Sequence, residues 1–522
     1  MKKIFNIFVL AFASLMMASI SSCVSKLDTD QHGVTGIDSY YKTDTEAQEA
    51  IANVYYLWNS MQFEFYIVLN YPSDDMYAGG KNYGANIPIE DLSYFTFDDS
   101  NSRMTNVFTY LYQIVYRCNV ILNNIGETAD SSAKKQVVAE AHFFRAWSYF
   151  YLTTLWGTPP LADHVLSPEE YVLPNSTKEE LWTLIETDLT TAINSGALAE
   201  KSGANDVQVR ITKTAAQSLL GKAYVWQEKW SDAATTLDAV ISSGKYALFT
   251  GTYGDILQHT TEFNCESVLE TNTIQDPANT LSAMTYISIG WRGELFDWSG
   301  NDTDIANSGY GQANPTRGLY DAFVAHEGVD GYRLKNTIWT YDDVKSHGIK
   351  IKEGRTLEQH DGVFSYKVRY TKDGQNGGTT RSHTNFRYMR YAEVLLLAAE
   401  AHVKNNNPGK ATEYVNQIRT RAKLPSLATV TMDDIKIEKR LELCYEHVRL
   451  MDLVRWGDAA TVLATKGQKI GVFTSDGVWN PEGYDNPRAG FKANKHELFP
   501  YPRTEMTVNT LITQNPGYAV SK

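Results

Sequence analysis

Several aromatic residues lie in stretches of the chain where apolar residues do not recur at helical intervals. Trp291 and Trp298 are seven residues apart within residues 244–315, which are rich in Gly, Asn, Asp and Thr. An aromatic ring stacks on the apolar face of a sugar ring, while carboxylate, amide and guanidinium groups hydrogen-bond its hydroxyl edge. Aromatic residues in such loops therefore predict a surface that captures oligosaccharides. The candidate ligand-binding residues are Trp291, Trp298, Tyr310, Tyr77, Tyr83 and Asp75.

Two further irregular stretches contain aromatic residues. In residues 71–97, Tyr77 and Tyr83 flank the pair Gly79 and Gly80. The other stretch covers residues 330–383. Long insertions carried on a rigid scaffold are where binding residues are concentrated in proteins. We therefore expect distant loops to meet in one ligand-binding region.

Recognisable reaction chemistry is missing from the sequence. It contains no G-x-x-x-x-G-K-[ST], G-x-G-x-x-G, G-x-S-x-G, H-E-x-x-H or C-x-x-C motif. Asp74 and Asp75 could supply half of a carboxylate pair for glycoside cleavage, but the sequence does not place a second acid opposite them. We assign no catalytic residue, no metal ligand and no cofactor. A surface glycoside hydrolase stays open as an alternative.

The charge balance limits the kinds of partner. The formal net charge is −13, and no block of Lys and Arg interrupts the acidic background. Binding to nucleic acid needs clustered basic side chains that neutralise phosphates. Nucleic acid is therefore excluded as an expected partner.

The first residues resemble a secretory leader that ends at a cysteine. Lys2 and Lys3 precede an apolar stretch over residues 4–17, and residues 20–23 (ISSC) are similar to a lipobox. We expect cleavage after residue 22 and lipidation of Cys23, followed by a polar tether to residue 40. After the leader, the sequence has no run of about 18 apolar residues, which is the length that a helix needs to cross a membrane. An ordinary signal peptide with an incidental cysteine is the alternative.

Helical spacing dominates the rest of the chain. Apolar residues recur at helical intervals over residues 45–61, 103–125, 132–156, 212–226 and 231–243, and Thr177 to Glu180 form a capping box. Small and large residues also recur at the offsets of a tetratricopeptide (TPR) repeat. These residues are Gly221, Tyr224, Ala233 and Leu237, and again Ala399, His402, Ala411 and Val415. The predicted fold is mostly α, a scaffold of TPR-like helical hairpins carrying a loop-rich, variable ligand-binding part.

Four segments resemble the SusD/RagB family of glycan-binding lipoproteins. They are residues 387–401 (RYMRYAEVLLLAAEA), 446–457 (EHVRLMDLVRWG), the ending at 499–505 and 514–518 (FPYPRTE and QNPGY), and 314–323 (NPTRGLYDAF). His447 stands where Arg is commoner in the family. The resemblance extends over nearly all of the chain after Cys23. Within it, Arg390, Glu393 and Arg455 are expected to contact the scaffold or a partner protein.

The resemblance implies an arrangement and a function. A single SusD-like domain would occupy residues 41–522, with TPR-like helices at 41–243, variable loops at 244–385 and family helices at 386–522. The protein would be a lipid-anchored lid, exposed at the cell surface, on a SusC-like TonB-dependent outer-membrane transporter. It would bind glycans and pass them inward without cutting them. A TPR-like lid that binds a peptide or another non-glycan nutrient is a further alternative.

Overall fold

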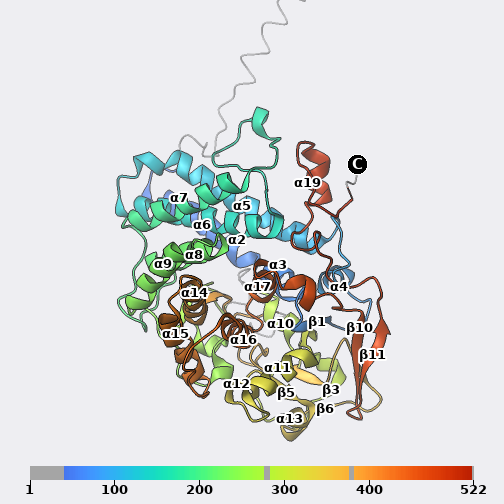
Figure 1. The fold of residues 1–522 in the computed structure, drawn as a ribbon. Helices are drawn as coiled ribbons and strands as arrows, with labels where there is room; N and C mark the ends of the chain where they lie inside the picture. Colours follow the sequence, from blue (N-terminus) through green and yellow to red (C-terminus); the bar gives the residue numbers. More distant parts are fainter. Residues whose placement is uncertain (1–39, 276–282, 376–380, 520–522) are drawn as a thin grey trace, which may run out of the picture.

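The computed structural model describes residues 40–275, 283–375 and 381–519 (Figure 1). Helices dominate the N-terminal part: α2 (Asp44–Ser60), α3 (Gln62–Asn70), α4 (Ile87–Tyr94), α5 (Ser102–Asn124), α6 (Ser132–Trp156), α7 (Lys178–Asn194), α8 (Lys213–Trp226) and α9 (Trp230–Ser242). Short helices follow in the middle: α10 (Thr285–Ile289), α11 (Arg317–Glu327), α12 (Tyr332–Lys335) and α13 (Tyr341–Ser346). The C-terminal part adds α14 (Tyr391–Lys404), α15 (Pro408–Arg421), α16 (Met432–Glu442), α17 (Arg449–Arg455), α18 (Ala459–Val462) and α19 (Arg503–Val508).

The strands are short and form small antiparallel sheets. Two-stranded sheets pair β1 (Met76–Gly79) with β4 (Gln312–Pro315), β2 (Ser267–Glu270) with β9 (Arg387–Arg390), β3 (Phe296–Asp297) with β6 (Lys350–Ile351), and β5 (Ile338–Thr340) with β8 (Val363–Ser365). A three-stranded sheet has the order β11 (Trp479–Asp485), β10 (Lys469–Thr474), β7 (Thr356–Glu358). Most of these pairs join segments that are far apart in the sequence, so the strands connect loops.

Local sequence accounts for the helix boundaries. The capping box expected at Thr177 and Glu180 is present and begins α7. The helix expected over residues 132–156 is α6, which ends at Gly157 with φ of +83°, a conformation that favours glycine. Each of these signals depends on residues only a few positions apart, so it does not require tertiary packing.

Close packing of small against large residues joins the helical hairpins. A Cβ atom on Gly221 of α8 would lie 2.5 Å from the side chain of Leu237 on α9, so a larger residue would force the Leu237 side chain to move. In the second hairpin Ala399 of α14 and Ala411 of α15 are fully buried. Figure 1 shows α14 and α15 beside α8 and α9, although more than a hundred residues separate the pairs in the chain. The predicted mostly α fold with TPR-like hairpins is confirmed.

A buried ionic cluster holds the junction between β9 and α14. The side chain of Arg390 is 1% exposed and donates to Glu446 at 2.6 Å, to Glu266 at 2.6 Å and to Glu442 at 3.0 Å. Burial would lower the pKa of the Arg390 guanidinium, but the surrounding carboxylates hold it well above its usual value. Arg390 is therefore a scaffold residue. A contact with a partner protein, the other role considered from the sequence, does not fit its burial.

Glu393 and Arg455 have the same structural character. Glu393 pairs with Lys222 of α8 at 2.9 Å, and Arg455 binds Glu400 at 2.6 Å, all with side chains at most 7% exposed. The first pair ties α14 to the N-terminal hairpin of α8 and α9, and the second ties α17 to α14. Glu393 and Arg455 are therefore buried scaffold residues.

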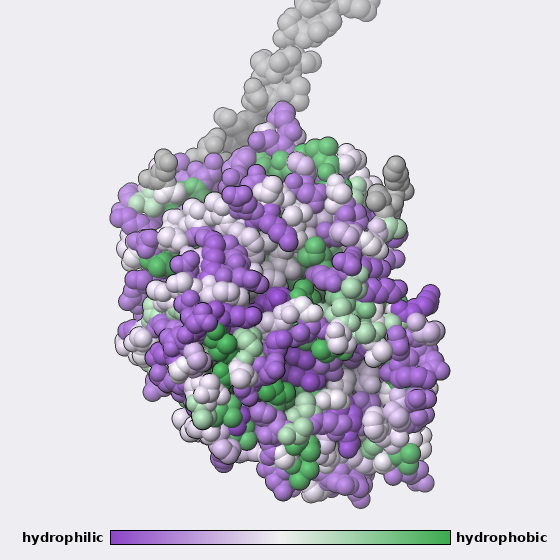
Figure 2. All heavy atoms as spheres, viewed as in Figure 1, coloured by the Kyte–Doolittle hydropathy of each residue, from purple (hydrophilic) through white to green (hydrophobic). Residues whose placement is uncertain are grey.

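Two general features of the described residues concern membranes and metals. Within residues 40–275, 283–375 and 381–519, no helix is both long and apolar enough to cross a bilayer. In the same ranges, no three side chains of His, Cys, Asp or Glu come together as a metal-binding group. Figure 2 shows hydrophobic residues in separate patches among hydrophilic ones on the face viewed.

Replacing Arg390 tests how much the ionic cluster contributes to the stability of the fold. We expect Arg390→Met to lower the free energy of unfolding by about 3–5 kcal/mol, because three buried carboxylates then each lose one of their cations. The measurement is urea unfolding followed by circular dichroism. The matched control is Lys345→Met, which removes an exposed pair with Asp342 and should shift the midpoint little. Equal midpoints for the two variants would contradict the structural weight given to Arg390.

Candidate functional site

Pairing between β1 and β4 brings the first two aromatic loops together. Tyr77 lies opposite Asn314, and the amide of Gly80 donates to the carbonyl of Gly311 at 2.8 Å. A Cβ atom on Gly79 would lie 2.3 Å from the Gly311 oxygen, and Gly79 has φ of +68°. Glycine is therefore required for this approach. The result places residues 76–84 beside residues 291–315.

The antiparallel pair of β10 and β11, which we call the C-terminal hairpin, completes the same region. The Tyr83 amide donates to Glu358 of β7 at 2.7 Å, and the rings of Tyr83 and Tyr484 lie 4.9 Å apart. Tyr484 belongs to β11, and Glu358 lies opposite Val472 of β10. Four segments from different parts of the chain thus meet on one surface. Because backbone hydrogen bonds hold them, this surface is pre-formed.

A shallow hollow lies at the centre of these loops. It is lined by Gly80, Trp291, Arg292, Leu295, Phe296, Gly311, Asn314, Leu357, Glu358, His360, Phe364 and Ser365. Its volume is about 20 Å³, whereas pockets that enclose a small ligand usually hold about 300–1,000 Å³. The hollow is therefore too small to enclose a ligand.

Charged groups surround the hollow. The carboxylate of Glu294 is 59% exposed and pairs with Arg292 at 2.8 Å. The hydrogen bond from Arg292 lowers the pKa of Glu294, and the positive charges of Lys81 and Arg355 act in the same direction. The region therefore offers both donors and acceptors to a polar ligand. We call the surface formed by residues 80–84, 291–298, 355–358 and 484 the loop surface.

Comparison with known proteins decides the family. Residues 333–518 match the model of the SusD family, and residues 37–225 match a family model described as starch-binding associating with outer membrane. The chain belongs to the SusD family.

Relatives match this SusD-family chain over nearly its full length. A SusD-like protein of Bacteroides ovatus is 25% identical, covering 98% of this chain and 97% of the relative. The starch-binding protein SusD of Bacteroides thetaiotaomicron is 24% identical over 99% of both chains. Among solved structures, a laminarin-binding SusD-like protein is 26% identical with a TM-score of 0.76, covering 92% of this chain and 100% of that one.

Trp291 is not the exposed platform residue that the loop sequence suggested. Its side chain is 4% exposed, and its Nε1 donates to the Ser365 carbonyl at 2.9 Å. It belongs to a second hydrophobic core with Phe296, Trp339 and Phe364. The expectation of exposure is wrong because local sequence does not show that these loops bury a core of their own. Trp298 is partly buried, 6.4 Å from Trp291 between ring centroids, and borders the same core.

Two further candidates are engaged inside the protein. Tyr77 is 8% exposed, and the ammonium of Lys466 lies 4.6 Å from its ring centroid. Asp75 is 1% exposed and pairs with Arg440 at 2.8 Å. Both therefore depart from the expectation of ligand-facing side chains, because each is itself buried against a partner more than 300 residues away in the chain.

Asp74 is also held in ion pairs. Burial alone would raise its pKa, but the guanidinium of Arg449, 2.8 Å away, lowers it to about 2. A general acid needs a raised pKa, so a carboxyl group held ionised in this way is unsuited to that role. Asp74 therefore loses support as a catalytic acid. Burial raises the pKa of Asp75, but this residue is only 1% exposed and so offers little surface to a substrate.

Tyr83 and Tyr310 keep part of their surface accessible. Tyr83 is partly buried and contacts Tyr484 on the loop surface. Tyr310 is partly buried against the main core, and its carbonyl accepts from Arg292 at 3.1 Å. Both therefore lie near the hollow. Their contact with a ligand stays a prediction.

The C-terminal hairpin contributes aromatic residues that were not among the candidates chosen from the sequence. Tyr484 faces Tyr83, and Trp479 is 38% exposed with its Nε1 donating to Asp361 at 2.9 Å. The guanidinium of Arg317 lies 5.7 Å from the Trp479 ring. Aromatic residues among Gly, Asn and Pro also occur in residues 477–487, so the signal that selected the other loops was present here.

The leader and the lipidation candidate lie outside the described residues. Residues 1–22, Cys23 and the tether to residue 39 are not placed by the structure. The lipidation of Cys23 therefore stays a prediction.

Replacing Trp291 tests its structural role. We expect Trp291→Ala to lower the free energy of unfolding by about 3–5 kcal/mol, because it leaves a cavity in the second core. Urea unfolding followed by tryptophan fluorescence and circular dichroism measures this effect. Trp479→Ala is the matched control and should cost less, since its indole is 38% exposed. An unchanged midpoint in Trp291→Ala would show that the indole is not a core residue.

Proposed function

We propose that this protein binds oligosaccharide and polysaccharide chains on the loop surface. The observation that carries the proposal is the combination of partly exposed aromatic rings and paired charges around a small hollow. Trp298, Tyr83 and Tyr484 offer ring faces, and Arg292, Glu294 and Glu358 offer hydrogen-bonding groups. An open surface accommodates a long chain that a closed pocket would exclude. The glycan ligands named for similar SusD-family proteins support the same ligand class.

The proposed activity is capture without cleavage. A glycosidase needs two carboxyl groups flanking the scissile bond, one of them able to hold a proton near neutral pH. The acidic pair singled out from the sequence is held by Arg440 and Arg449, away from such a role. Capture alone needs no proton donor.

The proposed setting is the outer membrane. One matching family model carries outer-membrane association in its description, which supports this location. We propose that lipidated Cys23 anchors the protein on the cell surface, where it covers a SusC-like TonB-dependent transporter and passes glycans to it. A lid that holds a chain on an open surface can release it without a chemical step.

Variants of two loop-surface rings test glycan binding. We expect Trp298→Ala and Tyr484→Ala each to weaken binding about fivefold, since one stacked ring contributes about 1 kcal/mol. Isothermal titration calorimetry with laminarihexaose, maltohexaose, cellohexaose and xylohexaose measures the affinity, after gels containing the parent polysaccharides identify which bind. Trp230→Ala, a partly buried tryptophan at the start of α9, is the matched control and should bind as the wild type does.

The same titrations also test the other interpretations. Shorter products on chromatography after incubation would contradict capture without cleavage. Wild-type affinity in both loop-surface variants would remove the loop surface as the site. Binding of peptides in place of every glycan would move the protein to the alternative ligand class.

The anchor has a separate test. We expect Cys23→Ala to move the protein from the membrane fraction to the soluble fraction, because acyl chains on this residue supply the attachment. Immunoblots of fractionated cells measure the distribution. Cys265→Ala is the control, since this partly buried cysteine lies inside the folded part. Retention of Cys23→Ala in membranes would refute lipidation as the anchor.

A further inference from the structure

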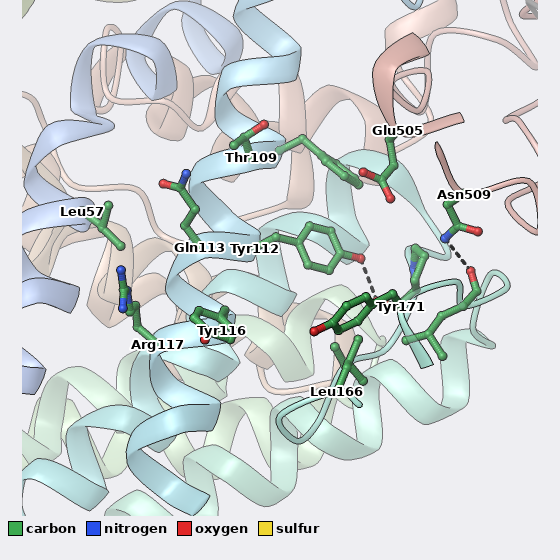
Figure 3. Close-up of a pocket in the computed structure, with 14 residues that line it drawn as sticks. Leu57, Thr109, Tyr112, Gln113, Tyr116, Arg117, Leu166, Tyr171, Glu505 and Asn509 are labelled. Carbon is green, nitrogen blue, oxygen red and sulfur yellow. Dashed lines mark hydrogen bonds between the residues drawn. The ribbon is translucent and has the colours of Figure 1, made fainter. Parts of the chain in front are cut away.

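A second, deeper cleft lies on the helical half of the molecule, away from the loop surface. It runs along α5 and is closed by residues 160–173 and by α19 (Figure 3). Its volume is about 530 Å³, within the range of about 300–1,000 Å³ that is usual for ligand pockets. The loop surface holds a much smaller hollow, so the protein has a cleft that the proposed function does not use.

Helix α5 presents two parallel rows of side chains to this cleft. Phe108, Tyr112 and Tyr116 follow each other at intervals of four residues and form an aromatic row. Thr109, Gln113 and Arg117 form a polar row one residue further along. Four residues rise about 6 Å along a helix. Along the cleft, each aromatic side chain therefore has a hydrogen-bonding side chain next to it. These pairs recur at a spacing comparable to the length of one sugar unit.

The opposite wall is held in place by hydrogen bonds. The Tyr112 hydroxyl donates to the Pro160 carbonyl at 2.7 Å, and the Asn509 amide donates to the Leu173 carbonyl at 2.8 Å. Figure 3 shows Tyr112, Tyr116 and Tyr171 around one space, with Arg117 at one end and Glu505 at the other. The cleft is thus formed before any ligand enters it.

Two rings in this cleft are unusually accessible. Tyr116 is 49% exposed and Tyr171 is 65% exposed. Core packing does not explain large aromatic groups that stay so far in water. A flat ligand stacked on them would cover this surface.

Glu505 adds a hydrogen-bond acceptor without a protein partner. Its carboxyl group is partly buried and lines the cleft, and among the described residues it has no ion pair or side-chain hydrogen bond. Burial raises its pKa, as expected for a carboxylate that no cation compensates. A ligand with hydroxyl groups would supply the missing donors.

We propose that this cleft is a second glycan-binding site that takes a short stretch of neutral oligosaccharide. Sugar faces stack on Tyr116 and Tyr171, while Gln113, Arg117 and Glu505 bond the hydroxyl edge. The inference rests on the proposed function for the ligand class but not for the place of binding. A protein with two separated sites holds a polysaccharide more firmly than either site alone, because the second contact is intramolecular.

The test separates the two sites by variants. One protein carries Trp298→Ala and Tyr484→Ala, another carries Tyr116→Ala and Tyr171→Ala, and a third carries all of them. Calorimetry uses the hexaose identified for the wild type from laminarihexaose, maltohexaose, cellohexaose and xylohexaose. We expect two sites in the wild type, one in each double variant with affinity at the altered site reduced at least tenfold, and none in the combined variant.

The control and the crystal structure make the outcome decisive. Tyr56→Ala on α2 replaces a tyrosine that is 42% exposed and outside the cleft, and it should bind as the wild type does. Crystals soaked in the same hexaose should show sugar along α5. One site in the wild type together with an empty cleft overturns this inference and leaves the loop surface intact. Sugar in the cleft alone supports the inference and contradicts the loop surface.

Two other results would also overturn the inference. The absence of every tested hexaose from both sites would remove the glycan ligand class, and the proposed function with it. Two glycan sites that survive unchanged in the variant with Tyr116→Ala and Tyr171→Ala, while this variant no longer copurifies with its transporter, would make the cleft a protein interface.

Discussion

The carboxylate of Glu442 is the point on which the interior of this protein depends. It is fully buried and lies within ion-pair distance of Arg333, Arg390 and Arg421, which come from α12, the β9–α14 junction and α15. Burial alone would raise the pKa of Glu442, but the three guanidinium groups hold it well below its usual range. Taking such charges out of water is costly, and their attraction offsets the cost only when every partner is in place. The cluster therefore fixes how these elements meet.

The same chemistry fastens the loop-rich part to the helical scaffold. Arg333 is fully buried and also pairs with Glu327 and Glu438, and Lys367 pairs with Glu446 next to the Arg390 cluster. Arg333 and Lys367 belong to the middle of the chain, whereas most of the carboxylates they bind come from the C-terminal helices. Loops anchored from inside can differ in outer sequence while their bases stay fixed. This arrangement suits a protein whose ligand is met by loops on a rigid frame.

Aromatic residues serve both the core and the surface, and burial separates the two uses. Trp58 stacks on Tyr388 inside the main core, and Trp291 packs on Phe364 in the second core. Tyr116 and Tyr171, in contrast, remain in water beside a pre-formed cleft. The proposed binding surfaces are therefore on different elements. The loop surface joins segments distant in sequence, whereas the aromatic row and the polar row of the cleft both lie on the single helix α5.

Short-range patterns in the sequence were sufficient for the helical architecture. The capping box of α7, the end of α6 at Gly157 and the approach of Gly221 to Leu237 depend on spacing within one helix or one hairpin, so they could be predicted. The family motifs left Arg390 as a contact of the scaffold or of a partner protein, and its burial decided for the scaffold. The loop candidates could not be resolved in this way. Trp291 and Trp298 have similar local sequence, yet Trp291 is buried in the second core and Trp298 is only partly buried at its edge.

What decided the site was the meeting of distant segments. Asp75 finds its cation at Arg440, and Tyr83 finds its aromatic neighbour at Tyr484, each several hundred residues away. No local pattern encodes such a meeting, because it follows from the packing of whole elements. A helical, SusD-like scaffold with aromatic loops could thus be predicted from the residues alone. Which aromatic groups are left for a ligand could not, since exposure depends on what the rest of the folded chain covers.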